Sequence, residues 1–242
     1  MTTKNAAGFT IIEVSLFLAV SGILAAGILV SSSASIGQQR YRDSVASLRS
    51  VIQEQYSAVT NVVNSSRANS YSCNSTANVN QSEGGSTQRG QSDCLILGKI
   101  IRITDGKNIS ISDVLGVRPA GATPTTSTDS EYGILNSYTL KSTDVGSEES
   151  TVAWSATVVP ESMSIAILRS PISSSILTFV STSATDSVDN IVSSNYRYPQ
   201  TDLCVSPEGV NDGGSQLAVR VMANATGPSA ITIPSEDDVS CL

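Results

Sequence analysis

The feature that most constrains this chain is an apolar run from Phe9 to Val30 in which Glu13 is the only charged residue. As an α-helix the run would be roughly 33 Å long, which is enough to cross the hydrocarbon core of a bilayer. An acidic side chain within such a helix costs up to about 3 kcal/mol at mid-bilayer and less toward either end. The run therefore predicts a membrane anchor, and Glu13 is expected to have a function there.

A short polar segment precedes the apolar run. Residues 1–8 contain Lys4 as their only charged side chain and end in the small residue Gly8. The sequence from Gly8 to Glu13, GFTIIE, followed by an apolar helix, resembles the cleavage and methylation signature of type IV pilins and pseudopilins. The resemblance implies that a prepilin peptidase cuts the Gly8–Phe9 bond and methylates the new amine of Phe9.

Cleavage would leave a cationic amine on Phe9 within the membrane, and this charge must be paired or neutralised. Glu13 lies four residues further on, so it could pair with the amine in the same helix or with that of a neighbouring subunit. By resemblance, the anchor helices leave the lipid during assembly and form the core of a filament. Gly8 and Phe9 are thus the candidate cleavage residues, Phe9 is the candidate methylation site, and Glu13 is the candidate assembly residue.

Two other interpretations account for the same run. A secretory signal peptide could be cut near Ser32-Ser33-Ala34, although Glu13 inside its apolar core argues against it. The run could also be a plain uncleaved anchor. Within the pilin interpretation, many major pilins have a proline where this chain has Val30. That difference favours a minor pilin or a pseudopilin.

The helix is expected to continue beyond the anchor. From residue 36 onward, apolar side chains recur at near-helical spacing, which predicts an amphipathic helix to about Asn64 with one face packed on a sheet. The apolar stripe consists of Ile36, Tyr41, Val45, Leu48, Ile52, Tyr56, Val59 and Val63. The opposite face is expected to be solvated and carries Gln39, Arg42, Asp43, Arg49, Gln53 and Glu54. The predicted organisation is a leader at 1–8, a transmembrane or filament-core helix at 9–30, an amphipathic continuation at 31–64 and a β-rich headgroup at 65–242.

The headgroup is predicted to be mainly β. Short runs of β-branched and aliphatic residues are separated by turn residues, which is typical of antiparallel hairpins. These runs are 95–104, 108–114, 151–159, 164–169, 176–181, 217–222 and 230–233. Asp105-Gly106 indicates a tight turn between the first two. Pro160 and Pro171 separate later strands, and Trp154 is expected to lie in the core. The fold class is therefore α+β, with a long N-terminal helix packed on a mainly antiparallel sheet.

The four cysteines indicate disulfides, because a chain with a membrane-targeting segment can place its headgroup in an oxidising compartment. Four cysteines allow three pairings, and the sequence does not choose among them. The preferred pairs are Cys73–Cys94 and Cys204–Cys241. The first would close the polar segment 65–93, which is expected to be a surface loop. The second would close a C-terminal loop that resembles the disulfide-bounded region of many pilins.

No enzymatic centre is expected. The chain has no histidine, which removes Ser-His-Asp and Cys-His catalysis and the histidine-based zinc sites. The cysteine spacing does not fit a zinc site, no phosphate-binding glycine loop occurs, and carboxylates such as Asp186 and Asp189 lack the spacing of a calcium loop. The formal charge of −7, with 14 Lys+Arg and no basic cluster, disfavours direct nucleic-acid binding. Neither a cofactor nor a metal is therefore expected.

Taken with the resemblance, the sequence predicts a structural subunit of a type IV pilus or a related filament. Its expected partners are the prepilin peptidase, other pilins, the inner-membrane assembly machinery and, before assembly, membrane lipid. Its expected locations are the cytoplasmic membrane before assembly and the cell surface afterwards. The alternatives are a minor pilin or pseudopilin of a secretion, adhesion or DNA-uptake machine with the headgroup as a binding module, and a membrane-tethered enzyme, which the residues support least.

Overall fold

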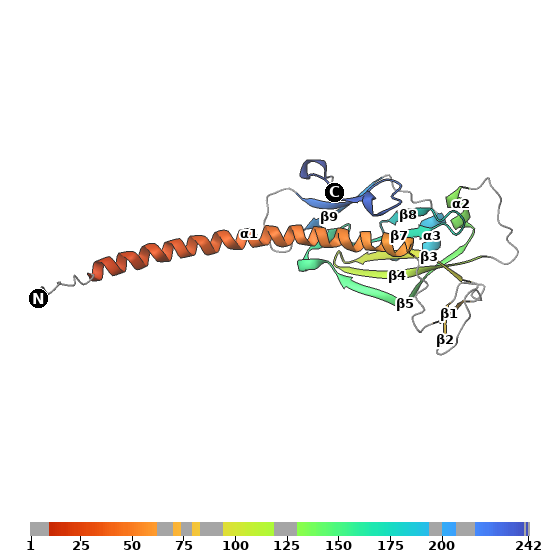
Figure 1. The fold of residues 1–242 in the computed structure, drawn as a ribbon, viewed down its shortest axis with the longest axis horizontal. Coiled ribbons are helices and arrows are strands. Elements are labelled where there is room, and N and C mark those ends of the chain that lie inside the picture. The colour runs from red at the N-terminus through yellow and green to blue at the C-terminus, as the bar shows by residue number, and fades with distance from the viewer. Residues whose placement is uncertain are drawn as a thin grey trace, which may run out of the picture. The chain divides into compact units, whose positions relative to one another are not determined.

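The computed structural model describes residues 10–61, 70–73, 79–82, 94–118, 130–193, 200–206, 216–239 and 241. The fold is α+β, with a long N-terminal helix and mainly antiparallel sheets, as the sequence predicts (Figure 1). The chain divides into two compact units, Met1–Arg40 and Tyr41–Leu242. The second unit is called the body below, and each unit is described by itself.

Helix α1 (Ile11–Thr60) contributes to both units. It contains the predicted apolar run from Ile11 onward and most of the predicted amphipathic continuation. Its last turn ends with the Asn61 N–H donating to the Ser57 carbonyl at 3.0 Å. The helix therefore ends slightly before the expected boundary at Asn64, which lies outside the described residues.

The body contains two larger sheets, in which every described strand pair is antiparallel. The five-stranded sheet has the order β5-β4-β3-β7-β8, formed by β5 (Thr139–Thr151), β4 (Asn108–Val117), β3 (Cys94–Thr104), β7 (Met163–Arg169) and β8 (Ile176–Ser181). The four-stranded sheet has the order β11-β10-β9-β6, formed by β11 (Ile231–Thr232), β10 (Leu217–Val221), β9 (Thr201–Ser206) and β6 (Thr157–Val159). A separate hairpin consists of β1 (Ser70–Cys73) and β2 (Val79–Ser82).

The predicted turn between β3 and β4 is confirmed. Asp105 and Gly106 both have positive φ, at 54° and 62°, and the Lys107 N–H donates to the Thr104 carbonyl at 3.1 Å. Positive φ at both central residues defines the turn type that matches the twist of a hairpin, and glycine adopts it without steric cost. A side chain at Gly106 would also collide with the Val158 carbonyl, since its Cβ would lie 2.7 Å from that oxygen.

The larger core lies where the body's part of α1 meets both sheets (Figure 1). The predicted apolar stripe is buried there, and its buried members are Tyr41, Val45, Leu48, Ile52, Tyr56 and Val59. Ile101 and Ile165 contribute from the five-stranded sheet and Val219 from the four-stranded one. Ile36 was predicted to belong to the buried stripe but is 48% exposed. Val63, the last predicted member, lies outside the described residues.

A second core covers the other face of the five-stranded sheet. Helices α2 (Glu131–Asn136) and α3 (Val188–Ser193) supply Leu135 and Ile191, which pack with Phe179 of β8. The Ser130 hydroxyl caps α2 by accepting a hydrogen bond from the Gly133 N–H at 3.2 Å. Neither short helix was predicted, because six residues are too few to show a helical period.

The prediction of one continuous strand at 151–159 is wrong. It contains the end of β5, a turn of 3₁₀-helix at Ala153–Ser155 and the strand β6, which belongs to the other sheet. Trp154 lies in that turn with φ of 57° and is 57% exposed, so its prediction as a core residue is also wrong. The chain changes sheets here, and the change turns the indole outward.

Two further predictions need correction. Segment 65–93 was expected to be a loop, but β1 and β2 form a hairpin within it; its other residues lie outside the described part. Strand β9 was not predicted, and β5 was predicted only at its last residue, Thr151. The sequence of β5 is polar and that of β9 is short, so neither has the alternation that marks a strand facing one core.

Candidate assembly site on the N-terminal helix

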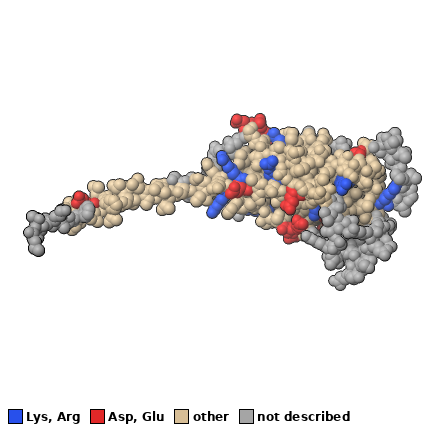
Figure 2. Space-filling model, in the orientation of Figure 1, with Lys and Arg blue, Asp and Glu red and all other residues tan. Residues whose placement is uncertain are grey.

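The first unit contains the one described helix that is long and apolar enough to cross a membrane, at Ile11–Leu29. None of this span is buried: Ile11 is 88% exposed and Leu29 is 71% exposed. Figure 2 shows this part of the helix without charged side chains, apart from the acidic group near its start. An exposed apolar surface of this length is typical of helices that contact lipid or other apolar helices.

The start of α1 is fixed by a reciprocal pair of hydrogen bonds between Thr10 and Glu13. The Glu13 N–H donates to the Thr10 hydroxyl, and the Thr10 N–H donates to the Glu13 carboxylate, both at 3.3 Å. The Thr10 hydroxyl also lies 3.3 Å from the same carboxylate oxygen. This arrangement is a capping box, in which two otherwise unpaired N–H groups of the first turn are satisfied.

The capping box explains how an acidic residue is accommodated in the apolar run. The Glu13 carboxylate is turned toward the N-terminal end of α1, where backbone N–H groups and the helix dipole favour negative charge. Glu13 is the predicted assembly residue, whereas its capping partner Thr10 was not predicted. The spacing of a threonine three residues before a glutamate was the available signal. The predicted cleavage residues Gly8 and Phe9 lie outside the described residues.

Small residues leave the helix surface open for close approach by other helices. A Cβ atom built on Gly22 or Gly27 would meet nothing within 4 Å. The Ser15 hydroxyl is satisfied within the helix, since it donates to the Ile11 carbonyl at 2.8 Å. Such small residues permit close packing of helices in lipid or in a bundle.

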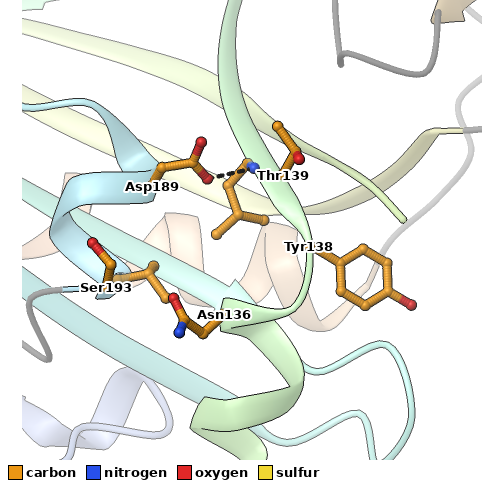
Figure 3. Close-up of a pocket in the computed structure, with 7 residues that line it drawn as sticks. Asn136, Tyr138, Thr139, Asp189 and Ser193 are labelled. Atoms are coloured by element: carbon orange, nitrogen blue, oxygen red, sulfur yellow. Dashed lines mark hydrogen bonds between the residues drawn. The ribbon is translucent and has the colours of Figure 1, made fainter. Parts of the chain in front are cut away.

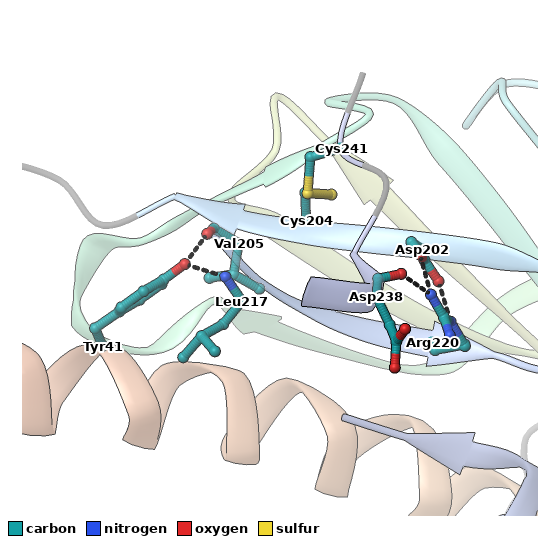
Figure 4. Close-up of a disulfide and its surroundings, with 8 residues drawn as sticks. All are labelled: Tyr41, Asp202, Cys204, Val205, Leu217, Arg220, Asp238 and Cys241. Atoms are coloured by element: carbon teal, nitrogen blue, oxygen red, sulfur yellow. Dashed lines mark hydrogen bonds and ion pairs between the residues drawn. A yellow bond between two sulfur atoms is a disulfide. The ribbon is translucent and has the colours of Figure 1, made fainter. Parts of the chain in front are cut away.

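In the body, Tyr41 joins α1 to the four-stranded sheet. Its hydroxyl donates to the Val205 carbonyl and accepts from the Leu217 N–H, both at 2.7 Å (Figure 4). Val205 and Leu217 are cross-strand partners at the ends of β9 and β10. The hydroxyl therefore connects the two strands where they approach the helix.

The polar face of α1 is only partly solvated, contrary to expectation. The Arg49 Nε donates to the Ile231 carbonyl at 3.1 Å, and the Gln53 amide donates to the Pro228 carbonyl at 2.9 Å. Arg42 and Glu54 on the same helix are exposed, as predicted. The two bonded side chains hold the C-terminal edge strand β11 against α1.

The C-terminal segment is also held by a disulfide between Cys204 and Cys241, which is the pairing preferred from the sequence (Figure 4). Beside it, Arg220 makes two parallel contacts with the Asp202 carboxylate, both at 2.7 Å, and donates to the Asp238 carbonyl at 2.7 Å. The hydrogen bond to Asp202 raises the pKa of Arg220.

The other predicted disulfide is described only in part. Cys94, the first residue of β3, is disulfide-bonded. The side chain of Cys73 lies outside the described part of the chain, so the predicted Cys73–Cys94 pair stays a prediction.

The body has a small pocket between α2, the start of β5 and α3, with a volume of about 160 Å³ (Figure 3). Its acidic group is Asp189, whose carboxylate accepts a hydrogen bond from the Leu140 N–H at 2.6 Å. Burial raises the pKa of Asp189, which the Leu140 hydrogen bond and the charge of Lys141 partly offset. Among the described residues there is no group of three or more potential metal ligands. Through its hydrogen bond to the Leu140 N–H, the Asp189 carboxylate fixes the start of β5.

No protein-family model matches this sequence, and no curated protein or solved structure is significantly similar to it. The interpretation of the site therefore depends on the residues of this chain alone.

Proposed function

We propose that this chain is a type IV pilin-like structural subunit, cut after Gly8, anchored in the cytoplasmic membrane by its N-terminal helix and polymerised through that helix into a surface filament. Its partners in this function are a prepilin peptidase, further copies or other pilins, the assembly machinery of the inner membrane and, before assembly, lipid. The observation that supports it most is the capped start of an apolar helix segment that has no buried residue, with the Glu13 carboxylate bonded to Thr10 at the N-terminal end of α1.

The exposed helix is consistent with two successive environments. Lipid would cover the surface of Ile11–Leu29 before assembly, and the helices of neighbouring subunits would cover it afterwards. The apolar area removed from water is similar in both environments, so transfer between them need not expose the helix to water. A charge pair can then decide which neighbours and which register are favoured.

Glu13 is suited to form that pair. Its carboxylate accepts from the N–H of Thr10, the residue that directly follows Phe9 in the sequence. Cleavage would place a cationic amine on Phe9, the residue directly before Thr10 in the sequence. In the membrane this amine would be paired within its own subunit, and in a filament it could be paired with Glu13 of a neighbour.

The mature N-terminus tests the processing step. Mass spectrometry of the membrane fraction and of sheared surface material is expected to find a chain that begins at Phe9 with one added methyl group. A chain that begins near Ser35 would indicate a signal peptide, and a chain that begins at Met1 would indicate an uncleaved anchor. Either result would exclude the proposed function.

Two substitutions of Glu13 separate its charge from its role in the helix cap. Glu13→Gln retains an acceptor suited to a capping box but cannot form a charge pair, whereas Glu13→Ala removes both. Both variants are expected to be cleaved, and both should enter filaments at least about tenfold less than the wild type, because a charge-assisted bond is lost. Glu54→Gln, at an exposed acid of the same helix, is the matched control and should assemble normally. Normal assembly of Glu13→Gln would show that Glu13 acts only as a cap.

A minor pilin or pseudopilin is the second candidate, with the body as a binding module. Val30 favours it, since many major pilins have a proline at the matching position. The abundance of the chain in sheared filaments distinguishes the two: a major pilin would be the main component, and a minor pilin a small fraction.

A further inference from the structure

The pocket between α2, the start of β5 and α3 has a lining that combines polar and apolar side chains (Figure 3). Its polar lining residues are Asn136, Tyr138, Thr139, Asp189 and Ser193. Leu140 and Val192 also line it, and both are buried. Polar groups that converge beside apolar side chains are typical of pockets that bind small molecules.

Two polar groups of the lining have hydrogen-bonding capacity to spare. The Asp189 carboxylate accepts the Leu140 N–H with Oδ1, and its Oδ2 forms no hydrogen bond with the described residues. The Asn136 side chain is exposed, and its amide likewise has no hydrogen-bond partner within the described part of the chain. A carboxylate oxygen only accepts hydrogen bonds, whereas an amide both donates and accepts. A ligand that satisfies both groups must therefore carry donors as well as acceptors.

Hydrogen bonds between the surrounding elements hold the pocket in shape. The Tyr132 hydroxyl donates to the Ser193 carbonyl at 2.9 Å and so joins α2 to α3. The bond between the Leu140 N–H and Asp189, at 2.6 Å, joins β5 to α3. Because these elements are already fixed to one another, a ligand would lose little binding free energy to the ordering of the site.

The charges at the pocket disfavour ions as ligands. An anion would be repelled by Asp189, which is the one charged side chain of the lining. The positive charge of Lys141 acts on the same carboxylate and would oppose a cationic ligand. A metal ion lacks ligands, since the described residues contain no group of three or more side chains that could hold one. These observations favour a neutral ligand.

We propose that this pocket binds one ring of a neutral sugar, with sugar hydroxyls bonded to Asp189 Oδ2 and to the Asn136 amide. Sugar hydroxyls both donate and accept hydrogen bonds, and the C–H groups of the ring can contact Leu140 and Val192. The volume of about 160 Å³ corresponds to roughly five waters at ~30 Å³ each, which is room for one ring and not for several. This inference adds a ligand to the body and does not depend on cleavage or assembly of the chain.

The test is amide NMR of the full chain in micelles of a zwitterionic detergent, because a detergent with a sugar head group would compete for the site. The probes are glucose, galactose, mannose and N-acetylglucosamine, added one at a time. At least one is expected to shift the Leu140 and Ser193 amides in a saturable way with a Kd of about 1–10 mM, since so small a ligand makes few contacts.

Ethanolammonium chloride and sodium acetate, at equal ionic strength, are the controls for a cationic and an anionic ligand. Neither should give saturable shifts of the Leu140 and Ser193 amides. Saturable shifts with one of these ions and with none of the sugars would overturn the proposal. The absence of a saturable shift with any of the probes would overturn it as well.

Two asparagine substitutions locate the binding. Asn136→Ala removes one proposed partner and should weaken sugar binding about fivefold, which corresponds to the loss of a typical hydrogen bond. Asn190→Ala, at an exposed residue of α3 that does not line the pocket, is the matched control and should bind like the wild type. Both side chains are exposed, so the amide spectrum away from the pocket should stay unchanged in both variants. Equal affinities of the two variants for the sugar would refute the site.

Discussion

The hydroxyl of Tyr41 offers a sharp test of how α1 is fixed to the sheet. Tyr41→Phe removes this hydroxyl and leaves the ring in its buried place. Two backbone groups would then lose their partner, the buried Val205 carbonyl and the partly buried Leu217 N–H. Each lost hydrogen bond is worth about 1 kcal/mol, and a buried group left unsatisfied costs about 1–3 kcal/mol.

The expected loss depends on whether the two strands can close the gap. Val205 and Leu217 are cross-strand partners, so a small shift could let them bond directly, and the loss would then be about 1 kcal/mol. Leu203 and Val219 are fully buried in the adjacent core and resist such a shift, because close-packed interiors repack only partly. We therefore expect a loss of about 2–3 kcal/mol.

Urea denaturation of the full chain in detergent, followed by the fluorescence of the single tryptophan, measures this loss. With an m-value of about 2 kcal/mol per M, the midpoint should fall by about 1 M or slightly more. Tyr132→Phe is the matched control, because the Tyr132 hydroxyl donates to the exposed Ser193 carbonyl, and its removal should cost about 0.5 kcal/mol or less. Hydrogen exchange of the Leu217 amide should accelerate in Tyr41→Phe. An equal loss in both variants would refute the assigned role of Tyr41.

Two more predictions concern the body. Arg220→Lys should lower the free energy of unfolding by about 1–3 kcal/mol in the same denaturation assay, because lysine cannot make the two parallel contacts to Asp202. Arg220→Met should lower it further, since it leaves that carboxylate unpaired. An equal stability of Arg220→Lys and wild type would contradict this. Because the folded-state pKa of Asp189 is raised, its contribution to stability is present below its unfolded pKa and is lost as the pH rises through its folded pKa. Asp189→Asn keeps an acceptor for the Leu140 N–H. The free energy of unfolding of this variant, relative to that of the wild type, should therefore be greater at pH 7 than at pH 3. Denaturation at both pH values measures this difference, and an equal difference at the two pH values would contradict the prediction.

Local patterns predicted the elements whose cause is local. The period of Tyr41, Ile52 and Val59 predicted the buried face of α1, because a helix in contact with one core shows that contact every three to four residues. Asp105-Gly106 predicted the hairpin turn, because only a few residue types tolerate positive φ twice in succession. The capping box at Thr10 and Glu13 is equally local and could have been predicted from its spacing.

Other features depend on partners far away in the sequence. Strand β5 is an edge strand with a mostly polar sequence, and its position depends largely on backbone pairing with β4, since Leu140 is its one side chain in the described apolar cores. Its register shifts between Ile111 and Asp113 of β4, which no pattern within β5 indicates. Edge strands commonly have such irregularities, which hinder pairing with other chains.

For the candidate site, neighbouring residues were enough to predict the apolar helix and its single acid, because hydropathy depends on a few residues in succession. The outward position of Trp154, and the bonds of Arg49 and Gln53 to the C-terminal segment instead of to water, came from the three-dimensional fold. The physical reason is that the exposure of a side chain depends on which distant segments cover it. In this protein, the change of sheet at Ala153–Ser155 leaves Trp154 exposed, and the return of the chain to β11 brings backbone acceptors to Arg49 and Gln53.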